Sequence, residues 1–186
     1  MIEATLQSQA LILHGFYSHS GNAYASRNPS DGDAFLAAEV KAVAAAALLA
    51  HTAAASLSIP APALVLAIGS TPTAHASGRL VQGPPLPPDT TLEVHAGVYP
   101  LLDLQQKATE LVAEPARDLA LAVLARVCST YPSRSPPQAL IDAGAIAFSK
   151  DTGPSGTFGE VYNSGPLEGW CVTKISQVQR SFKLLS

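Results

Sequence analysis

The sequence has few residues of the kinds that nucleic-acid binding requires. Of its 186 residues, 13% are charged and 6% are aromatic, and the 11 lysines and arginines form no basic run. Basic residues do not alternate with aromatic ones either. Phosphate groups are neutralised by clustered positive charge, so this composition argues against a nucleic-acid partner.

Targeting signals and long uninterrupted apolar stretches are also missing. The first ten residues lack a positively charged segment, and the longest alanine-rich run is interrupted by Glu39, Lys41 and His51. We therefore expect neither a signal peptide nor a membrane span, and we expect a cytoplasmic protein. With 47% hydrophobic residues and a net charge of −3, the chain has enough apolar side chains to bury a core.

Cysteine is rare, and the common catalytic signatures are absent. Cys128 and Cys171 show no CxxC or Cys/His ligand spacing, so we expect two buried thiols without a metal or redox role. The sequence contains no GxGxxG, GxxxxGK[ST], GxSxG or HExxH motif. These absences argue against the dinucleotide-binding, P-loop, serine-hydrolase and zinc-protease classes.

The first two thirds of the chain contain three short apolar runs, each followed by glycine and polar residues. The runs read ALILHGFY (10–17), ALVLAIGST (63–71) and TLEVHAGVYP (91–100). They predict parallel strands near 10–16, 63–68 and 91–95. Between the first two, the alanine-rich segment from Asp33 to about Ala55 predicts a helix, which Ser30 or Asp31 could cap.

The pattern changes near residue 118. Three strand-like segments, 119–132, 138–151 and 170–178, are separated by Pro, Ser and Gly clusters without a long helix between them. A short helix is expected between Asp103 and Leu111, and 82–90 is expected to be a proline-rich loop. We predict an α/β plus β fold, in which a partial (β/α) barrel (1–115) precedes a partial β domain (116–186).

Polar residues at the ends of the three strands are the candidate site, because barrel enzymes build their active sites from the loops at the carboxyl ends of strands. Gly69, Ser70 and Thr71 suggest a phosphate cradle, because glycine lets backbone N–H groups approach oxygens closely. A second interpretation is a zinc-dependent hydrolase. Its ligands would come from a set with no recognised spacing, namely His14, His19, His95 and Asp103.

Six blocks of the sequence resemble the D-serine dehydratase and D-threonine aldolase family. In chain order they read GFYSHSGNAYAS, IGSTPT, EVHAGVYPLLDLQQ, LARVCSTYP, LIDAGAIAFSKDTGP and WCVTKISQ, and they extend from about residue 10 to 177. The family consists of pyridoxal-phosphate enzymes with an alanine racemase-like barrel followed by a β domain. The resemblance therefore implies the fold that the strand pattern also predicts.

The resemblance also implies cofactor contacts. The two family tyrosines seven residues apart correspond to Tyr17 and Tyr24, and the threonine that contacts the phosphate corresponds to Thr71. The Gly-Asn pair of the family corresponds to Gly97 and Val98. Valine keeps the backbone N–H at this position but lacks the amide side chain of asparagine.

Two family features have no counterpart in this sequence. The lysine that carries the cofactor as a Schiff base lies upstream of the matching blocks, and none of the five lysines here has that context: Lys41, Lys107, Lys150, Lys174 and Lys183. Full-length relatives are also expected to bind zinc through a His-x-Cys pair, but after the last block this chain reads ISQVQRSFKLLS, with Val178 and Gln179 at the acidic and histidine positions. We therefore assign no catalytic residue and no metal ligand.

The implied activity is that of a pyridoxal-phosphate lyase acting on D-amino acids. Family members convert D-serine to pyruvate and ammonia, or split the Cα–Cβ bond of a β-hydroxy D-amino acid as D-threonine aldolase does, and are expected to be homodimers. We expect this chain to be an incomplete, inactive form of the dehydratase type. The alternatives are an aldolase-type lyase and a non-catalytic fragment that binds the cofactor.

Overall fold

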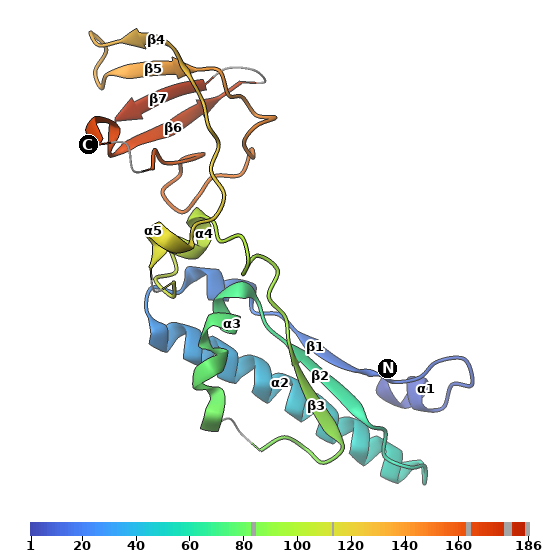
Figure 1. The fold of residues 1–186 in the computed structure, drawn as a ribbon. Coiled ribbons are helices and arrows are strands. Elements are labelled where there is room, and N and C mark those ends of the chain that lie inside the picture. The colour runs from blue at the N-terminus through green and yellow to red at the C-terminus, as the bar shows by residue number, and fades with distance from the viewer. Residues whose placement is uncertain (83–84, 113, 163–164, 177–179, 185–186) are drawn as a thin grey trace. The chain divides into compact units, whose positions relative to one another are not determined.

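A computed structural model describes residues 1–82, 85–112, 114–162, 165–176 and 180–184 of the chain (Figure 1). The polypeptide divides into two compact units. The first contains Met1–Leu102 and Gln106–Asp118, and the second contains Asp103–Gln105 and Leu119–Ser186.

A parallel sheet of three strands forms the framework of the first unit. In the order β1-β2-β3 it contains Gly15–Ser18, Leu64–Ile68 and Thr90–Val94. Both neighbouring pairs are parallel, which confirms the predicted strand direction. The first strand begins later than predicted, at Gly15, which pairs with Val65 of β2.

One long helix, α2 (Pro29–Ser56), covers one face of this sheet (Figure 1). Leu36, Val40 and Val43 of α2 pack in the same buried cluster as Leu66 and Ile68 of β2. By length and apolar composition α2 meets the requirement for crossing a membrane, and it is the one such helix in the described part of the chain. Residues of α2 pack against the sheet in the buried core, so its apolar composition is that expected of a core helix.

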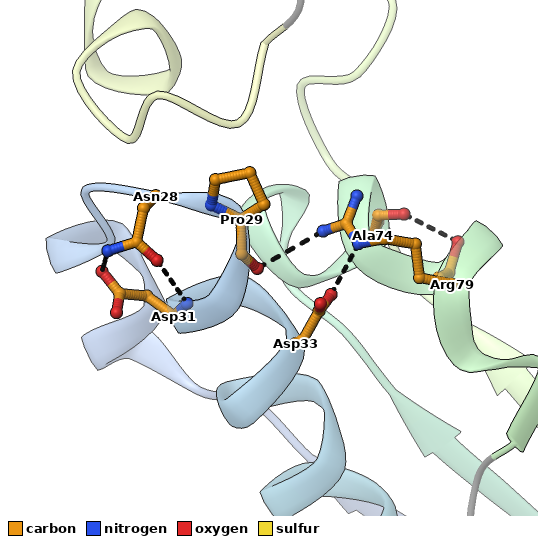
Figure 2. Close-up of polar contacts among 7 residues, drawn as sticks. Asn28, Pro29, Asp31, Asp33, Ala74 and Arg79 are labelled. Atoms are coloured by element: carbon orange, nitrogen blue, oxygen red, sulfur yellow. Dashed lines mark hydrogen bonds and ion pairs between the residues drawn. The ribbon is translucent and has the colours of Figure 1, made fainter.

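The start of α2 differs from the prediction. The cap is Asn28, whose side chain accepts a hydrogen bond from the Asp31 N–H at 3.0 Å, rather than Ser30 or Asp31. Pro29 follows the cap at the first helical position, which needs no N–H donor. Figure 2 shows that Arg79 contacts the same end of α2, with Nε 2.8 Å from Asp33 Oδ1 and Nη2 3.4 Å from the Pro29 carbonyl.

Short helices complete the first unit. The chain starts with α1 (Ile2–Leu6), and a 3₁₀ turn, η1 (Gly21–Ala25), follows β1. After β2 come α3 (Thr71–Ala76) and η2 (Ser77–Gln82). The helix predicted between Asp103 and Leu111 is reduced to α4 (Leu104–Lys107), whose residues divide between the two units, and α5 (Pro115–Asp118) ends the first unit.

The second unit is built on an antiparallel sheet in the order β4-β5-β7-β6. Along the chain its strands are β4 (Val127–Tyr131), β5 (Gln138–Ile141), β6 (Trp170–Ile175) and β7 (Arg180–Leu184), and η3 (Gly165–Leu167) precedes β6. The β-rich character predicted for this part is confirmed, whereas β7 (Arg180–Leu184) was not among the predicted strand segments. Cys171 is buried as predicted, but Cys128 is exposed because it lies in β4, an edge strand.

A partial parallel sheet followed by a separate antiparallel sheet is the predicted architecture of a partial barrel with a β domain. In the first unit, the carboxyl ends of β1, β2 and β3 lie at the same edge of the sheet, because the strands are parallel. This edge is where the candidate residues are found.

Candidate functional site

The loops after β2 and β3 lie in direct backbone contact. The His95 N–H donates to the Ile68 carbonyl at 2.7 Å. Gly69, the residue after Ile68, has φ +116°. A Cβ at this position would lie 2.4 Å from the carbonyl oxygen of His95. Only glycine adopts this backbone conformation and leaves room for the neighbouring strand end, so Gly69 allows the two loops to approach each other.

A cluster of four rings lies at the strand ends, formed by Tyr17, His19, Tyr24 and His95. The Tyr17 ring centroid lies 5.3 Å from that of His95 and 6.3 Å from that of His19. His19 in turn lies 6.5 Å from Tyr24. Tyr17 as a residue is 58% exposed, so the cluster presents aromatic surface on which another flat ring can pack.

Hydrogen bonds fix two members of this ring cluster. His19 Nδ1 lies 3.1 Å from the Gly69 carbonyl and 3.3 Å from the Tyr17 hydroxyl. Because a carbonyl only accepts, the bond to Gly69 requires the proton on Nδ1 of His19. His95 Nε2 lies 2.6 Å from Glu93 Oε1, an exposed ion pair when the imidazole is protonated.

The strand register explains which residues face the ring cluster. Tyr17, Ala67 and Glu93 are partners across the three strands, and the next row along is Phe16, Leu66 and Leu92. The second row packs in the core with α2. Because successive side chains on a strand point to opposite faces, Tyr17 and Glu93 occupy the face that α2 does not cover.

Thr71 connects the loop after β2 to the loop after β3. The Val98 N–H donates to Thr71 Oγ1 at 3.1 Å, and Thr71 is 1% exposed. Beside it, Ser70 caps α3 in a reciprocal arrangement in which the Ser70 N–H donates to Thr73 Oγ1 at 2.8 Å. The Thr71 hydroxyl is therefore held at a defined position at the start of α3.

Thr71 also lines an open hollow of about 450 Å³. The lining residues come from α3 and from the end of β3 and its loop: Thr71, Ala74, His75, Val94, Ala96 and Tyr99. Nε2 of His75 is buried and has no hydrogen-bond partner among the described residues. Burial lowers the pKa of His75, and the charge of Asp118 partly opposes this effect. His75 is therefore biased towards the neutral imidazole.

The five residues implied by the family resemblance lie in two adjoining groups. Tyr17 and Tyr24 belong to the ring cluster, whereas Thr71 lines the hollow and is bonded to Val98. Gly97 is exposed beside Val98 in the same loop. His95 of the ring cluster lies between Val94 and Ala96, which line the hollow, so the two groups adjoin at this residue.

Sequence reasoning did not single out Glu39, His75 or Glu93. Glu93 could have been identified from its position two residues before His95, which places both side chains on the same side of a strand. Glu39 and His75 lie within helices, and the sequence pattern there does not distinguish them from their neighbours. The zinc alternative finds no support in the described residues, which contain no group of three or more His, Cys, Asp or Glu side chains placed to hold a metal. Asp103, one of its four ligands, belongs to the other unit.

Solved structures with this architecture define the class of fold. An alanine racemase-like protein from Idiomarina loihiensis superposes with a TM-score of 0.70 at 26% identity, over 92% of this chain and 43% of the other. D-threo-3-hydroxyaspartate dehydratase from a Delftia species gives a TM-score of 0.66 at 27% identity, over 98% and 45%. A D-threonine aldolase from Filomicrobium marinum, at 16% identity and a TM-score of 0.54, shares the fold. The fold is alanine racemase-like.

Sequence comparisons give the family. Residues 120–184 match the family model described as "Putative serine dehydratase domain". The chain is 39% identical over 180 residues to D-serine dehydratase of Schizosaccharomyces pombe, covering 95% of this chain and 41% of the relative. It is 34% identical over 152 residues to the Delftia D-threo-3-hydroxyaspartate dehydratase, covering 82% and 35%. The chain belongs to the D-serine dehydratase family and spans about two fifths of the length of these curated relatives.

Proposed function

We propose that this chain supplies cofactor-contacting loops of a pyridoxal-phosphate lyase that converts a β-hydroxy D-amino acid, D-serine in the first instance, to an oxo acid and ammonia. The observation that carries the proposal is the convergence of the ring cluster and the Thr71 hollow at the carboxyl edge of one parallel sheet. Family membership implies pyridoxal phosphate in general terms. When bound, this cofactor acts as an electron sink for bond cleavage at Cα of the amino acid.

The residues of the hollow fit the phosphate end of the cofactor. Thr71 Oγ1 accepts from the Val98 N–H, which leaves the hydroxyl proton available for donation to a phosphate oxygen. The buried Nε2 of His75, which has no partner among the described residues, supplies unsatisfied hydrogen-bonding capacity at the same hollow. The Val98 backbone N–H positions Thr71, so this contribution does not need the asparagine side chain of the family.

The ring cluster fits the pyridine end. Tyr17 offers an exposed aromatic face held between His19 and His95, and Tyr24 extends the same surface through His19. Such a surface binds a flat heteroaromatic ring by stacking or edge contact, worth about 0.5–1.5 kcal/mol for each ring pair beyond the area buried. In this arrangement Tyr17 and Tyr24 orient the ring and exclude water from one side of it.

The dehydratase activity is favoured over the aldolase activity. The curated relatives cited above are dehydratases by name, whereas the aldolase structure, at 16% identity, shares only the fold. We further propose a D-amino acid as the small-molecule substrate, a homodimer as the assembly and the cytoplasm as the location.

We also propose that the 186-residue chain alone does not turn over D-serine. Lys41 lies on the exposed surface of α2 and Lys107 at the end of α4, whereas Lys150 and Lys174 belong to the second unit. The fifth, Lys183, has a side chain outside the described residues. None of the described lysines lies in the ring cluster or lines the hollow, so none of these four amines is placed at the candidate site to exchange a proton with Cα. Such a group contributes about 10² to 10⁴-fold to the rate.

The proposal is tested by binding and turnover in the same preparation. Pyridoxine 5′-phosphate lacks the aldehyde and does not react with surface lysines, so equilibrium dialysis with it reports the site itself. We expect saturable binding that Tyr17→Ala weakens and that Tyr131→Ala, the same change in β4 of the second unit, leaves unchanged. Pyruvate release from D-serine with pyridoxal phosphate and zinc is expected to stay at the free-cofactor background. Absence of saturable binding would refute the cofactor site, and turnover with a covalent adduct on one of the five lysines would refute the second part.

A further inference from the structure

Glu39 of α2 has a buried side chain that is hydrogen-bonded to the loop after β1. It is 1% exposed, and it is the one acidic or basic side chain in the buried set of the described residues. Its Oε1 accepts a hydrogen bond from the Ser20 N–H at 2.6 Å, whereas Oε2 is buried without a partner among the described residues. Burying a carboxyl group costs free energy because the group loses its contacts with water. The hydrogen bond from the Ser20 N–H offsets part of that cost.

The group that Glu39 binds lies in the middle of the loop that carries the ring cluster. Ser20 follows His19, whose Nδ1 contacts the Gly69 carbonyl, and it is the N-cap residue of η1, the 3₁₀ turn that contains Tyr24. The loop begins at the end of β1, one residue after Tyr17. Glu39 therefore binds the loop at Ser20, which lies between Tyr17 and Tyr24 in the chain, from the side that faces the core.

This contact is separate from the attachments at the ends of the loop. At its end the loop is tied to the start of α2 by the Arg27 N–H, which donates to Asp31 Oδ2 at 2.8 Å. At its start it continues the β1–β2 pairing, which reaches Ser18 and Ile68. Between these ends, the bonds made by His19 and Ser20 tie the loop to other elements: His19 to the strand edge and Ser20 to α2.

We propose that Glu39 is a positioning residue for the cofactor site. Through its bond to the Ser20 N–H it fixes the distance between the loop and α2, and thereby the relative placement of Tyr17 and Tyr24. The effect on the cofactor rests on the function proposed above, whereas the effect on the loop does not. Glu39 touches neither ring itself and acts through the Ser20 backbone. This role explains why a buried acidic side chain lies among the alanines of α2.

Three substitutions separate positioning from general stability. Glu39→Leu removes the acceptor and keeps an apolar side chain of similar size, whereas Glu39→Gln keeps an oxygen acceptor for the Ser20 N–H. Val43→Ala is the matched control, because Val43 is buried in the same helix one turn further on and belongs to the core cluster. If Glu39→Leu does not fold, Glu39→Asp replaces it, since it keeps the charge but is one methylene too short to preserve the bond.

Two measurements are made on the full 186-residue chain. Amide hydrogen exchange at Ser20, relative to the β2 amides, reports the loop, and equilibrium dialysis with pyridoxine 5′-phosphate reports the site. For Glu39→Leu or Glu39→Asp we expect Ser20 exchange to accelerate and ligand affinity to fall, each by at least about tenfold, the factor that corresponds to losing one hydrogen bond to a charged group. Glu39→Gln is expected to stay within about threefold of wild type in both measurements, because the acceptor remains.

The outcomes distinguish this inference from the proposed function. Unchanged Ser20 exchange in Glu39→Leu or Glu39→Asp overturns the positioning role whatever the ligand does. Faster exchange with unchanged affinity overturns the link between the loop and the cofactor, as does an equal loss of affinity in Val43→Ala. If the wild-type chain binds no pyridoxine 5′-phosphate, the proposed function and the cofactor link fail together, and Ser20 exchange still decides whether Glu39 positions the loop.

Discussion

The backbone N–H of Val98 donates a hydrogen bond to the side-chain oxygen of Thr71 at 3.1 Å. This bond joins the loop after β3 to the start of α3, and it is made by the main chain of a residue whose side chain differs from the family asparagine. The position of the Thr71 hydroxyl therefore depends on the backbone at residue 98 and tolerates the change of side chain there.

Thr71→Val is expected to weaken binding of pyridoxine 5′-phosphate. Valine has nearly the same shape, but it removes the donor to the phosphate and the acceptor for the Val98 N–H, at a cost of about 1–3 kcal/mol. Equilibrium dialysis measures the affinity. Thr130→Val, the same change in β4 of the second unit, is the control and should bind as the wild type does. Equal affinities for all three proteins would show that Thr71 contributes nothing to the site.

Gly69→Ala is expected to destabilise the first unit by at least about 2 kcal/mol, because a side chain at φ +116° is strained and its Cβ would lie 2.4 Å from the His95 carbonyl oxygen. Urea unfolding followed by circular dichroism measures the change. Gly78→Ala provides the comparison, since nothing lies within 4 Å of a Cβ there, and it should alter stability by less than about 0.5 kcal/mol. Similar midpoints for both variants would contradict the close approach of the two loops.

His75 is expected to make stability depend on pH. Burial lowers the pKa of His75 in the folded chain below its ordinary value of 6.5. The unfolded chain therefore binds the proton more readily, so His75 lowers stability as pH falls from about 6.5 through the folded-state pKa. Urea midpoints measured between pH 8 and pH 5 should fall less steeply for His75→Gln than for the wild type. Identical slopes would mean that the imidazole titrates normally in the folded chain.

Asn28→Ala is expected to cost about 1 kcal/mol of stability, because it removes the oxygen that accepts from the Asp31 N–H at the start of α2 (Figure 2). Ser30→Ala is the informative comparison, since Ser30 was a candidate cap by sequence but lies inside the helix. Thermal unfolding of the two variants gives the answer. A larger loss for Ser30→Ala would place the cap where the sequence pattern suggested.

Local chemistry determined much of the first unit. Strand-forming runs that end in glycine and polar residues specified three parallel strands and placed the candidate residues at one edge, because periodicity and turn residues act within a few positions of the chain. The blocks that resemble the D-serine dehydratase family pointed to the same residues. The exact start of β1 did not follow, because its first paired residue, Gly15, is set by a long-range contact with Val65 of β2.

Only the tertiary structure decided which side chains meet. The ring contact between Tyr17 and His95 joins residues from opposite edges of the sheet, and it exists because the register aligns Tyr17 with Glu93. The bond between Glu39 and Ser20 requires α2 to fold back over the loop that precedes it. In the sequence Glu39 is one acidic residue in an alanine-rich helix, and its burial is set by the packing of that helix on the sheet. The sequence by itself thus determined the elements and the edge where the site lies, while long-range packing determined the contacts within the site.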